Sequence, residues 1–256
     1  MEPRDRRPTL AAAALVLAAV ALACLAPAAA AERVRGIDVS RFQGKIDWGR
    51  VGQTQVEFAF VQASRGSGDD CAVAPTSCGP DTFYDRNHRR ARAAGIRVGA
   101  YHRAFAGGGG RRATRRDARV EARIFTREVG RLGDRDLLPA LDLESPFGDL
   151  GARRLTLWIR VWLDRVEEEL GAAPIIYTNT SSWQATGDTT RFARQGHPLW
   201  VANWHVRRPS VPAQNWAGEG WTVWQHTSSG SVRGIGGRVD RNRLRAGSAL
   251  ETITAR

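Results

Sequence analysis

The sequence predicts an α/β fold, a modified TIM-type barrel built from a single domain. Short apolar runs alternate with helical patterns along the chain, which is typical of parallel βα units. Eight runs have the character of strands, at residues 35–40, 58–64, 97–102, 138–144, 174–178, 199–203, 222–226 and around 239–240. Eight strands within roughly 200 residues favour one barrel over two smaller domains.

Helices are expected between these strands, over residues 83–94, 114–132 and 153–170. The first ends before a glycine, which is a C-cap signal, and the other two repeat apolar side chains at helical spacing. The helical signal fades after residue 195. The last three strands are therefore expected to lack full helices between them, unlike the strands of a regular barrel.

The first 31 residues have the pattern of a secretory signal peptide. A charged head precedes an apolar run from Leu10 to Ala31, and four alanines close the run, as at a small-residue cleavage site. Cleavage there would leave residues 32–256 as a secreted or wall-associated domain without a stable membrane span. A retained membrane anchor and a lipid anchor at Cys24 are the alternatives.

Removal of this segment leaves two cysteines, Cys71 and Cys78. In an exported protein such a close pair is expected to form a disulfide, which would stabilise the fold by roughly 2–3 kcal/mol. Two cysteines are too few for a structural zinc site, and no histidine spacing accompanies them. The sequence therefore predicts neither a metal nor a cofactor.

The chain carries a net charge of +12, and Lys45 is the only lysine among its 38 basic residues. Such a surface predicts polyanionic surroundings, which could be nucleic acid, an anionic membrane or an acidic polymer such as a cell wall. No nucleic-acid recognition motif accompanies the charge, and export also argues against nucleic acid. Anionic cell-wall components are therefore the expected partners.

Five arginines are spaced four apart within the second expected helix. They are Arg115, Arg119, Arg123, Arg127 and Arg131. The simplest interpretation is a solvated outer face, partly balanced by the acidic residues of the same helix, Asp117, Glu121 and Glu128. A stripe that binds anions is the alternative interpretation.

Four carboxylates lie at three of the predicted strand ends: Asp38, Asp142, Glu144 and Asp240. In a parallel α/β barrel the site residues project from the C-terminal ends of the strands. Asp142 and Glu144 are two residues apart, so on a strand they share a face. Ionisable side chains so close to apolar runs are costly unless they are used or paired. Helix capping and pairing with arginine are the structural alternatives.

Tryptophans add a second indication of function. Five of the nine crowd into residues 200–224, in the last third of the chain: Trp200, Trp204, Trp216, Trp221 and Trp224. Exposed aromatic faces pack against sugar rings. Carboxylates together with aromatic side chains at a barrel mouth favour glycoside hydrolysis, in which paired carboxylates act on the glycosidic oxygen and the anomeric carbon.

The order of these segments resembles glycoside hydrolase family 25, the Chalaropsis-type lysozymes. The matching segments are residues 36–40 (GIDVS), 46–48 (IDW), 98–102 (VGAYH), 141–144 (LDLE), 176–178 (IYT), 199–202 (LWVA), 224–228 (WQHTS) and 239–242 (VDRN). Each is weak alone, but the ordered set is specific. It covers residues 35 to about 244, so residues 32–256 are expected to form one catalytic domain of this family.

The resemblance implies a (β/α)5(β)3 barrel with five βα units and three final strands. It also implies cleavage of the β-1,4 bond between N-acetylmuramic acid and N-acetylglucosamine in peptidoglycan. Glu144 matches the general acid, and Asp142 matches the residue that assists the N-acetyl group of the substrate, with Asp38 and Asp240 in support. Direct inversion through water has also been considered for the family, and the sequence favours neither route.

Protonation follows from the same resemblance. A general acid must be protonated near its working pH, and carboxylates that share a pocket raise at least one pKa. Glu144 is therefore expected to hold a proton while Asp142 stays charged. Five further side chains are expected to bind the substrate: Gln62, Tyr101, Tyr177, Trp204 and Trp224.

Three positions depart from the family pattern. Arg65 stands where the family often has an acidic residue, which leaves the subsite preference open, Arg103 stands where it usually has Phe, and Trp204 replaces a Tyr. A sugar-binding relative without catalysis and a chitinase-type barrel are the alternative functions. Retention of all four acids opposes the first, and Ala140, where chitinases carry an Asp, opposes the second. The protein is expected to be a monomer.

Overall fold

The computed structural model describes residues 33–67 and 78–255. The expected signal peptide lies outside these residues. Cys71 also lies outside them, so its disulfide with Cys78 stays a prediction. Within the described part of the chain, none of the helices combines the length and the hydropathy that crossing a bilayer requires.

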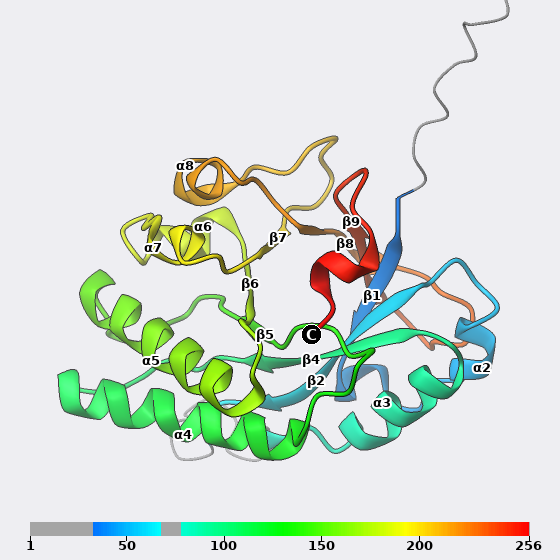
Figure 1. Cartoon of the computed structure of the whole chain (residues 1–256), viewed down its shortest axis with the longest axis horizontal. Coiled ribbons are helices and arrows are strands. Elements are labelled where there is room, and N and C mark those ends of the chain that lie inside the picture. Colours follow the sequence, from blue (N-terminus) through cyan, green and yellow to red (C-terminus); the bar gives the residue numbers. More distant parts are fainter. Residues whose placement is uncertain (1–32, 68–77, 256) are drawn as a thin grey trace, which may run out of the picture. The chain divides into compact units, whose positions relative to one another are not determined.

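A nine-stranded sheet forms the centre of the fold (Figure 1). Its strands are β1 (Arg35–Val39), β2 (Phe58–Arg65), β3 (Gly79–Pro80), β4 (Arg97–Arg103), β5 (Ala140–Asp142), β6 (Ile175–Thr178), β7 (Leu199–Ala202), β8 (Val223–Gly230) and β9 (Val239–Leu244). The order is β1-β9-β8-β7-β6-β5-β4-β2-β3, and a further pairing of β1 with β2 closes a barrel that leaves the two-residue β3 outside. All eight expected strands are present, and the predicted fold class is confirmed.

Strand direction differs from the expectation at one place. β1, β2 and β4 to β8 run parallel, whereas β9 is antiparallel to both of its neighbours. Asp240 was expected to end the last strand, but it lies near the start of β9. Because β9 is reversed, its first residues reach the same rim as the C-terminal ends of the parallel strands, so the carboxylate still lies with the others.

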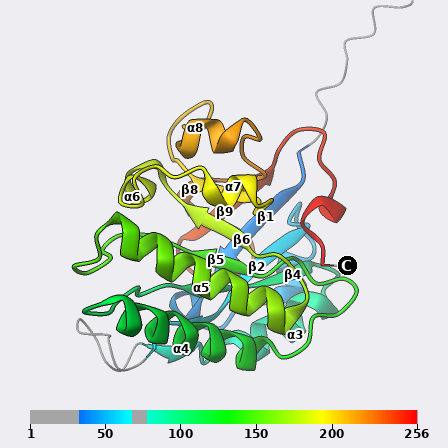
Figure 2. The ribbon, with the colours of Figure 1, turned by 60° about the vertical axis from the view of Figure 1, so that its left-hand side comes forward.

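Helices cover the outside of the barrel, with α4 and α5 side by side (Figures 1 and 2). They are α2 (Trp48–Val51), α3 (Tyr84–Ala93), α4 (Arg111–Val129), α5 (Ala152–Leu170), α6 (Thr180–Gln184), α7 (Arg191–Arg194) and α8 (Pro212–Ala217), with 3-10 turns η1 (Arg41–Gln43) and η3 (Leu250–Ile253). The three expected helices are confirmed as α3, α4 and α5. The segment after residue 195 contains the six-residue α8, whose inner residues have left-handed backbone angles, and β8 leads to β9 without a helix.

Side chains fill the barrel, so it is a packed core and not a pore. Alternate strand residues such as Phe58, Phe60 and Trp200 point inward, and the rings of Phe60 and Trp200 stack with centroids 4.5 Å apart. The packing leaves no room at Gly36, where a Cβ atom would lie 2.3 Å from the Phe58 ring. Because the interior is full, polar chemistry is confined to the rim.

Candidate active site

The inward-facing positions change from apolar to polar at the rim. In β1 the alternation runs from Gly36 to Asp38, in β5 from Ala140 to Asp142, and in β6 from Ile175 to Tyr177. The alternation that buries the core therefore also directs the polar side chains of several strands toward one place.

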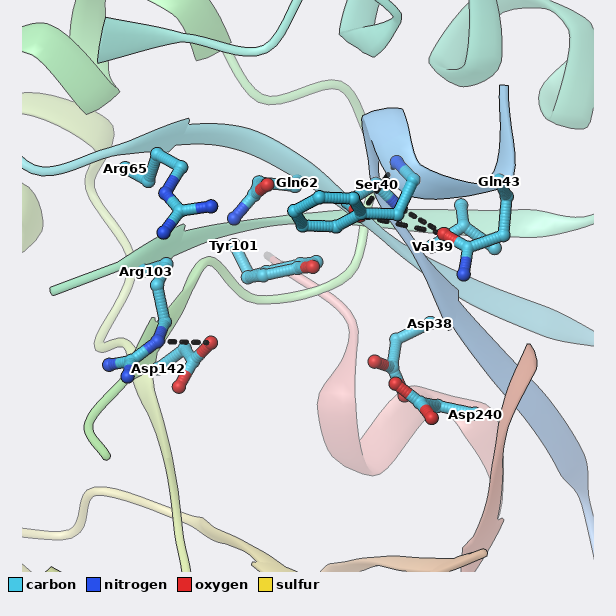
Figure 3. Close-up of a pocket in the computed structure, with 11 residues that line it drawn as sticks. Asp38, Val39, Ser40, Gln43, Gln62, Arg65, Tyr101, Arg103, Asp142 and Asp240 are labelled. Atoms are coloured by element: carbon cyan, nitrogen blue, oxygen red, sulfur yellow. Dashed lines mark hydrogen bonds and ion pairs between the residues drawn. The ribbon is translucent and has the colours of Figure 1, made fainter. Parts of the chain in front are cut away.

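Two adjoining cavities lie at this rim. One of about 320 Å³ is lined by Asp38, Gln62, Tyr101, Asp142 and Asp240 together with polar residues of β2, β4 and the η1 turn (Figure 3). The second, of about 200 Å³, shares four of these residues and adds Glu144, Tyr177 and Trp204. The structure thus brings all the expected site residues to one cleft except Trp224.

Asp38 and Asp240 face each other across the pairing of β1 with β9. Asn242 Nδ2 donates to Asp38 at 2.8 Å, and Gln225 Nε2 donates to it at 3.1 Å. Burial and the Asp240 charge raise the pKa of Asp38 well above its usual value, while the two amide donors act in the opposite direction. The pKa of Asp240 is also raised, chiefly by burial, so both shifts favour a proton shared between Asp38 and Asp240. Two amide donors oppose a cation here, and among the described residues no acidic or histidine cluster suits a metal ion.

Arg103 joins the Asp142 and Glu144 carboxylates. Its Nε lies 3.7 Å from Asp142 Oδ2 and its Nη2 lies 3.7 Å from Glu144 Oε2. Its Nη1 also donates to the backbone carbonyls of Ala104 and Glu144 at 3.0 and 3.1 Å. The guanidinium group therefore fixes the chain after β5 as well as the two side chains.

Burial of Asp142 acts against the charged form that was expected for this side chain. Burial raises the pKa of Asp142 well above its usual value, with Glu144 acting in the same direction, and the opposing effects of Arg103 and Arg65 are smaller than that of burial. The direction of this shift opposes the expectation that Asp142 stays charged in the protein by itself. A hydrogen-bond donor from a bound sugar would favour the charged form again.

An aromatic wall completes the cleft. Tyr177 Oη and Trp204 Nε1 both donate to Gln225 Oε1, at 3.0 and 2.9 Å. Gln225 in turn donates to Asp38, so one amide couples the aromatic wall to the carboxylates. Trp204 leaves 42% of its surface exposed, which suits it to packing against a sugar ring. It also lines a neighbouring hollow of about 410 Å³ with Asn179 and Asn203.

Comparison with known proteins decides the family. The family model described as glycosyl hydrolases family 25 matches residues 37–235. The chain belongs to glycosyl hydrolase family 25. The predicted resemblance is therefore confirmed, and the matched residues include every residue that lines the two cavities of the cleft except Asp240.

Several known proteins are similar to this chain over most of its length. Lysozyme M1 of Streptomyces globisporus is 32% identical, covering 84% of this chain and 69% of the relative. The N,O-diacetylmuramidase of Chalaropsis sp is 28% identical, covering 81% of this chain and 96% of its own. The crystal structure of the bacterial lysozyme from Streptomyces coelicolor superposes with a TM-score of 0.72 at 32% identity, covering 86% of this chain and 95% of that one.

Trp224 is the expected site residue that the structure does not bring to the family 25 cleft. In β8, Val223 and Gln225 point into the barrel, so the residue between them points outward. Its indole is buried in the outer core and donates to the backbone carbonyl of Asn203 at 2.8 Å. Gln225, the next residue, faces the site instead.

Gln225 and Asn242 are the site residues that sequence reasoning missed. Gln225 lies within the residues matched to family 25, Asn242 lies beyond them, and both are amides two residues from an inward-facing position. Alternation from Val223 in β8 and from Asp240 in β9 could have assigned them to the cleft.

A buried chain of hydrogen bonds lies directly behind the site. Ser64 Oγ lies 2.8 Å from His102 Nδ1, and His102 Nε2 lies 2.7 Å from Glu121 Oε2. The order resembles a hydrolase triad, but all three side chains are fully buried and none lines a cavity described above. Burial lowers the pKa of His102 to about 3, so the imidazole is neutral and connects Ser64 to Glu121.

Helix α4 carries the arginine stripe, but two of its acidic residues do not balance the charge of the stripe as expected. Glu121 accepts from the backbone N–H of Phe105 at 3.1 Å, and Asp117 accepts from that of Gly107 at 2.9 Å. Both acids are buried, so they anchor the segment after β4 and do not balance the surface charge. Of the five arginines of the stripe, Arg115 is partly buried and the other four are exposed: Arg119, Arg123, Arg127 and Arg131.

Proposed function

We propose that this family 25 protein is a lysozyme that hydrolyses the β-1,4 bond between N-acetylmuramic acid and N-acetylglucosamine in peptidoglycan. The convergence of four carboxylates on one rim of the barrel, beside an exposed indole, carries the proposal. Relatives named lysozyme and N,O-diacetylmuramidase support it. The exposed arginines of α4 favour anionic wall components as a further partner. The enzyme is proposed to act as a monomer.

In the proposed mechanism Glu144 protonates the glycosidic oxygen as the bond to the anomeric carbon breaks. Its side chain is 31% exposed, against 12% for Asp142, which suits a group that must meet the leaving sugar. Asp142 accepts a hydrogen bond from the N–H of the substrate's acetamido group, and the carbonyl oxygen of that group attacks the anomeric carbon. Water then attacks the anomeric carbon and opens the ring that the acetamido group has formed with it, and Glu144 takes a proton from this water.

A turbidity assay on purified bacterial walls tests the activity. We expect the suspension to clear, with new reducing ends appearing in step. Binding to walls without new reducing ends would favour a sugar-binding relative without catalysis. Cleavage of chitin oligomers with no effect on walls would favour a chitinase-like enzyme.

Secretion is part of the proposal and predicts a processed N-terminus. Hydropathy and the four alanines before Glu32 support removal of residues 1–31. After expression in a secreting bacterial host, intact-mass and N-terminal analysis of the extracellular protein is expected to find a chain that begins at Glu32. A membrane-bound product that retains Met1 would contradict this, and so would one that begins with a lipid-modified Cys24.

A disulfide between Cys71 and Cys78 is proposed to stiffen one wall beside the cleft. Peptide mapping without reduction is expected to recover the two cysteines in one linked peptide. Reduction is expected to lower the free energy of unfolding by roughly 2–3 kcal/mol and to expose residues 66–80 to proteases. Free thiols at both positions, or no effect of the reductant on proteolysis, would contradict the proposal.

A further inference from the structure

Two arginines face the cleft across from Asp38 and Asp240 (Figure 3). β2 ends at Arg65 and β4 ends at Arg103, and these two residues are paired in register. An irregularity of register in β2, between Gln62 and Ser64, makes this possible. The extra residue shifts the alternation, so Arg65 shares a face with Gln62, whereas a regular strand would direct it away from the cleft.

The ring of Phe105 supports both guanidinium groups. The Cζ atom of Arg65 lies 4.9 Å from the ring centroid, and that of Arg103 lies 5.4 Å from it. Cation–π contacts at these distances hold the planar groups in place. Phe105 is itself anchored, because its backbone N–H donates to the buried Glu121. The two cations are therefore presented to the cleft by a fixed support.

The two arginines differ in their partners. Arg103 contacts two carboxylates, as described above. Among the residues that the structure describes, Arg65 has no carboxylate within ion-pair distance, and its Nε is buried without a hydrogen-bond acceptor. Burial lowers the pKa of Arg65, and repulsion by Arg41 and Arg103 adds to this. A half-buried guanidinium group that has like-charged neighbours and an N–H group without an acceptor is stabilised when an anion binds to it.

We propose that Arg65, assisted by Arg103, forms a subsite for a carboxylate carried by the glycan next to the bond that is cut. The inference rests on the proposed lysozyme function and adds a substrate feature to it. A guanidinium group binds a carboxylate through two parallel hydrogen bonds. Asp38 and Asp240 repel an anion from the other side of the same cavity, so a sugar with a carboxylate would enter in one orientation. That carboxylate could belong to the lactyl group of muramic acid or to an attached peptide stem.

Three soluble glycan substrates separate these sources. The first is a peptide-free strand with free lactyl carboxylates, the second is the same strand after reduction of the carboxyl groups to alcohols, and the third carries peptide stems. Wild type is expected to show a kcat/KM about tenfold or more higher on the first than on the second, since a charge-assisted pair contributes at least this much. Arg65→Gln is expected to remove the preference through KM. Arg90→Gln, which removes an exposed charge on α3, is expected to keep it.

Each outcome bears on one claim. Loss of activity in Arg65→Gln on the peptide-bearing strand alone would assign the site to stem carboxylates. An unchanged preference, or an equal loss on all three substrates, would overturn the anion subsite and leave the lysozyme function standing. No cleavage of any strand by wild type would overturn the proposed function itself. If Arg65→Gln fails to fold, the rates of wild type on the three substrates still test the subsite. Equal rates on the first two substrates would contradict a subsite for the lactyl carboxylate. A higher rate on the third substrate than on the first would support a subsite for a stem carboxylate.

Discussion

Glu144→Gln is expected to lower the turnover of wall hydrolysis by about 10²–10⁴-fold, the usual contribution of a general acid. The amide keeps the shape of the side chain and can still bind the glycosidic oxygen, but it has no proton to transfer. The side chain is 31% exposed and its ion pair with Arg103 is long, at 3.7 Å, so stability is expected to change little. Initial rates of reducing-end release and a thermal melt measure the two quantities on one sample.

Glu167→Gln is the matched control, because it makes the same chemical change on the exposed side of α5. Its rate and its melting temperature are expected to equal those of wild type. Full lytic activity in Glu144→Gln would remove this residue from the mechanism. A melting temperature that falls together with the rate would mean that Glu144 acts through the fold and not through proton transfer.

The second large effect is expected at Glu121→Ala, which should lower the free energy of unfolding by about 3–5 kcal/mol. His102 and the backbone N–H of Phe105 both direct hydrogen bonds at this buried carboxylate. Removing it leaves two buried donors without an acceptor and opens a cavity between α4 and the barrel. Denaturant unfolding at neutral pH measures the loss.

Glu121→Gln separates the hydrogen bonds from the volume of the side chain. Its amide oxygen can still accept one of the two donors, so a smaller loss than in the alanine variant is expected. Glu167→Ala, an exposed acid changed in the same way, is expected to alter the free energy of unfolding by less than about 0.5 kcal/mol. Equal stability of Glu121→Ala and wild type would mean that the buried chain of hydrogen bonds does not support the fold.

The strands were predictable because each buries an apolar run, and the carboxylates were predictable because the ends of such runs meet at one rim. Period-two alternation also predicts that Gln225 and Trp224 point to opposite faces of β8. It assigns each of them to the inner or the outer face only once one residue of β8 is known to point inward. Asp240 was assigned to the right rim with the wrong strand end, because residue patterns do not reveal that β9 is antiparallel.

Two features, one in the site and one behind it, depend on information that a single sequence lacks. A register shift in β2 turns Arg65 toward the cleft, and no residue type in this segment marks it. The acidic residues of α4 could not be divided between surface and interior from the sequence. Asp117 and Glu121 are buried because they accept hydrogen bonds from the segment after β4, and tertiary packing sets the path of that segment. In both cases the missing knowledge is of register and packing.

The identity of the new reducing end tests the central claim most directly. Purified peptidoglycan is digested with wild type and, in parallel, with Glu144→Gln, and the soluble fragments are reduced with borohydride and analysed by mass spectrometry. We expect fragments that end in reduced N-acetylmuramic acid with wild type and almost none with the variant. Fragments that end in reduced N-acetylglucosamine, or equal yields from the two proteins, would contradict it.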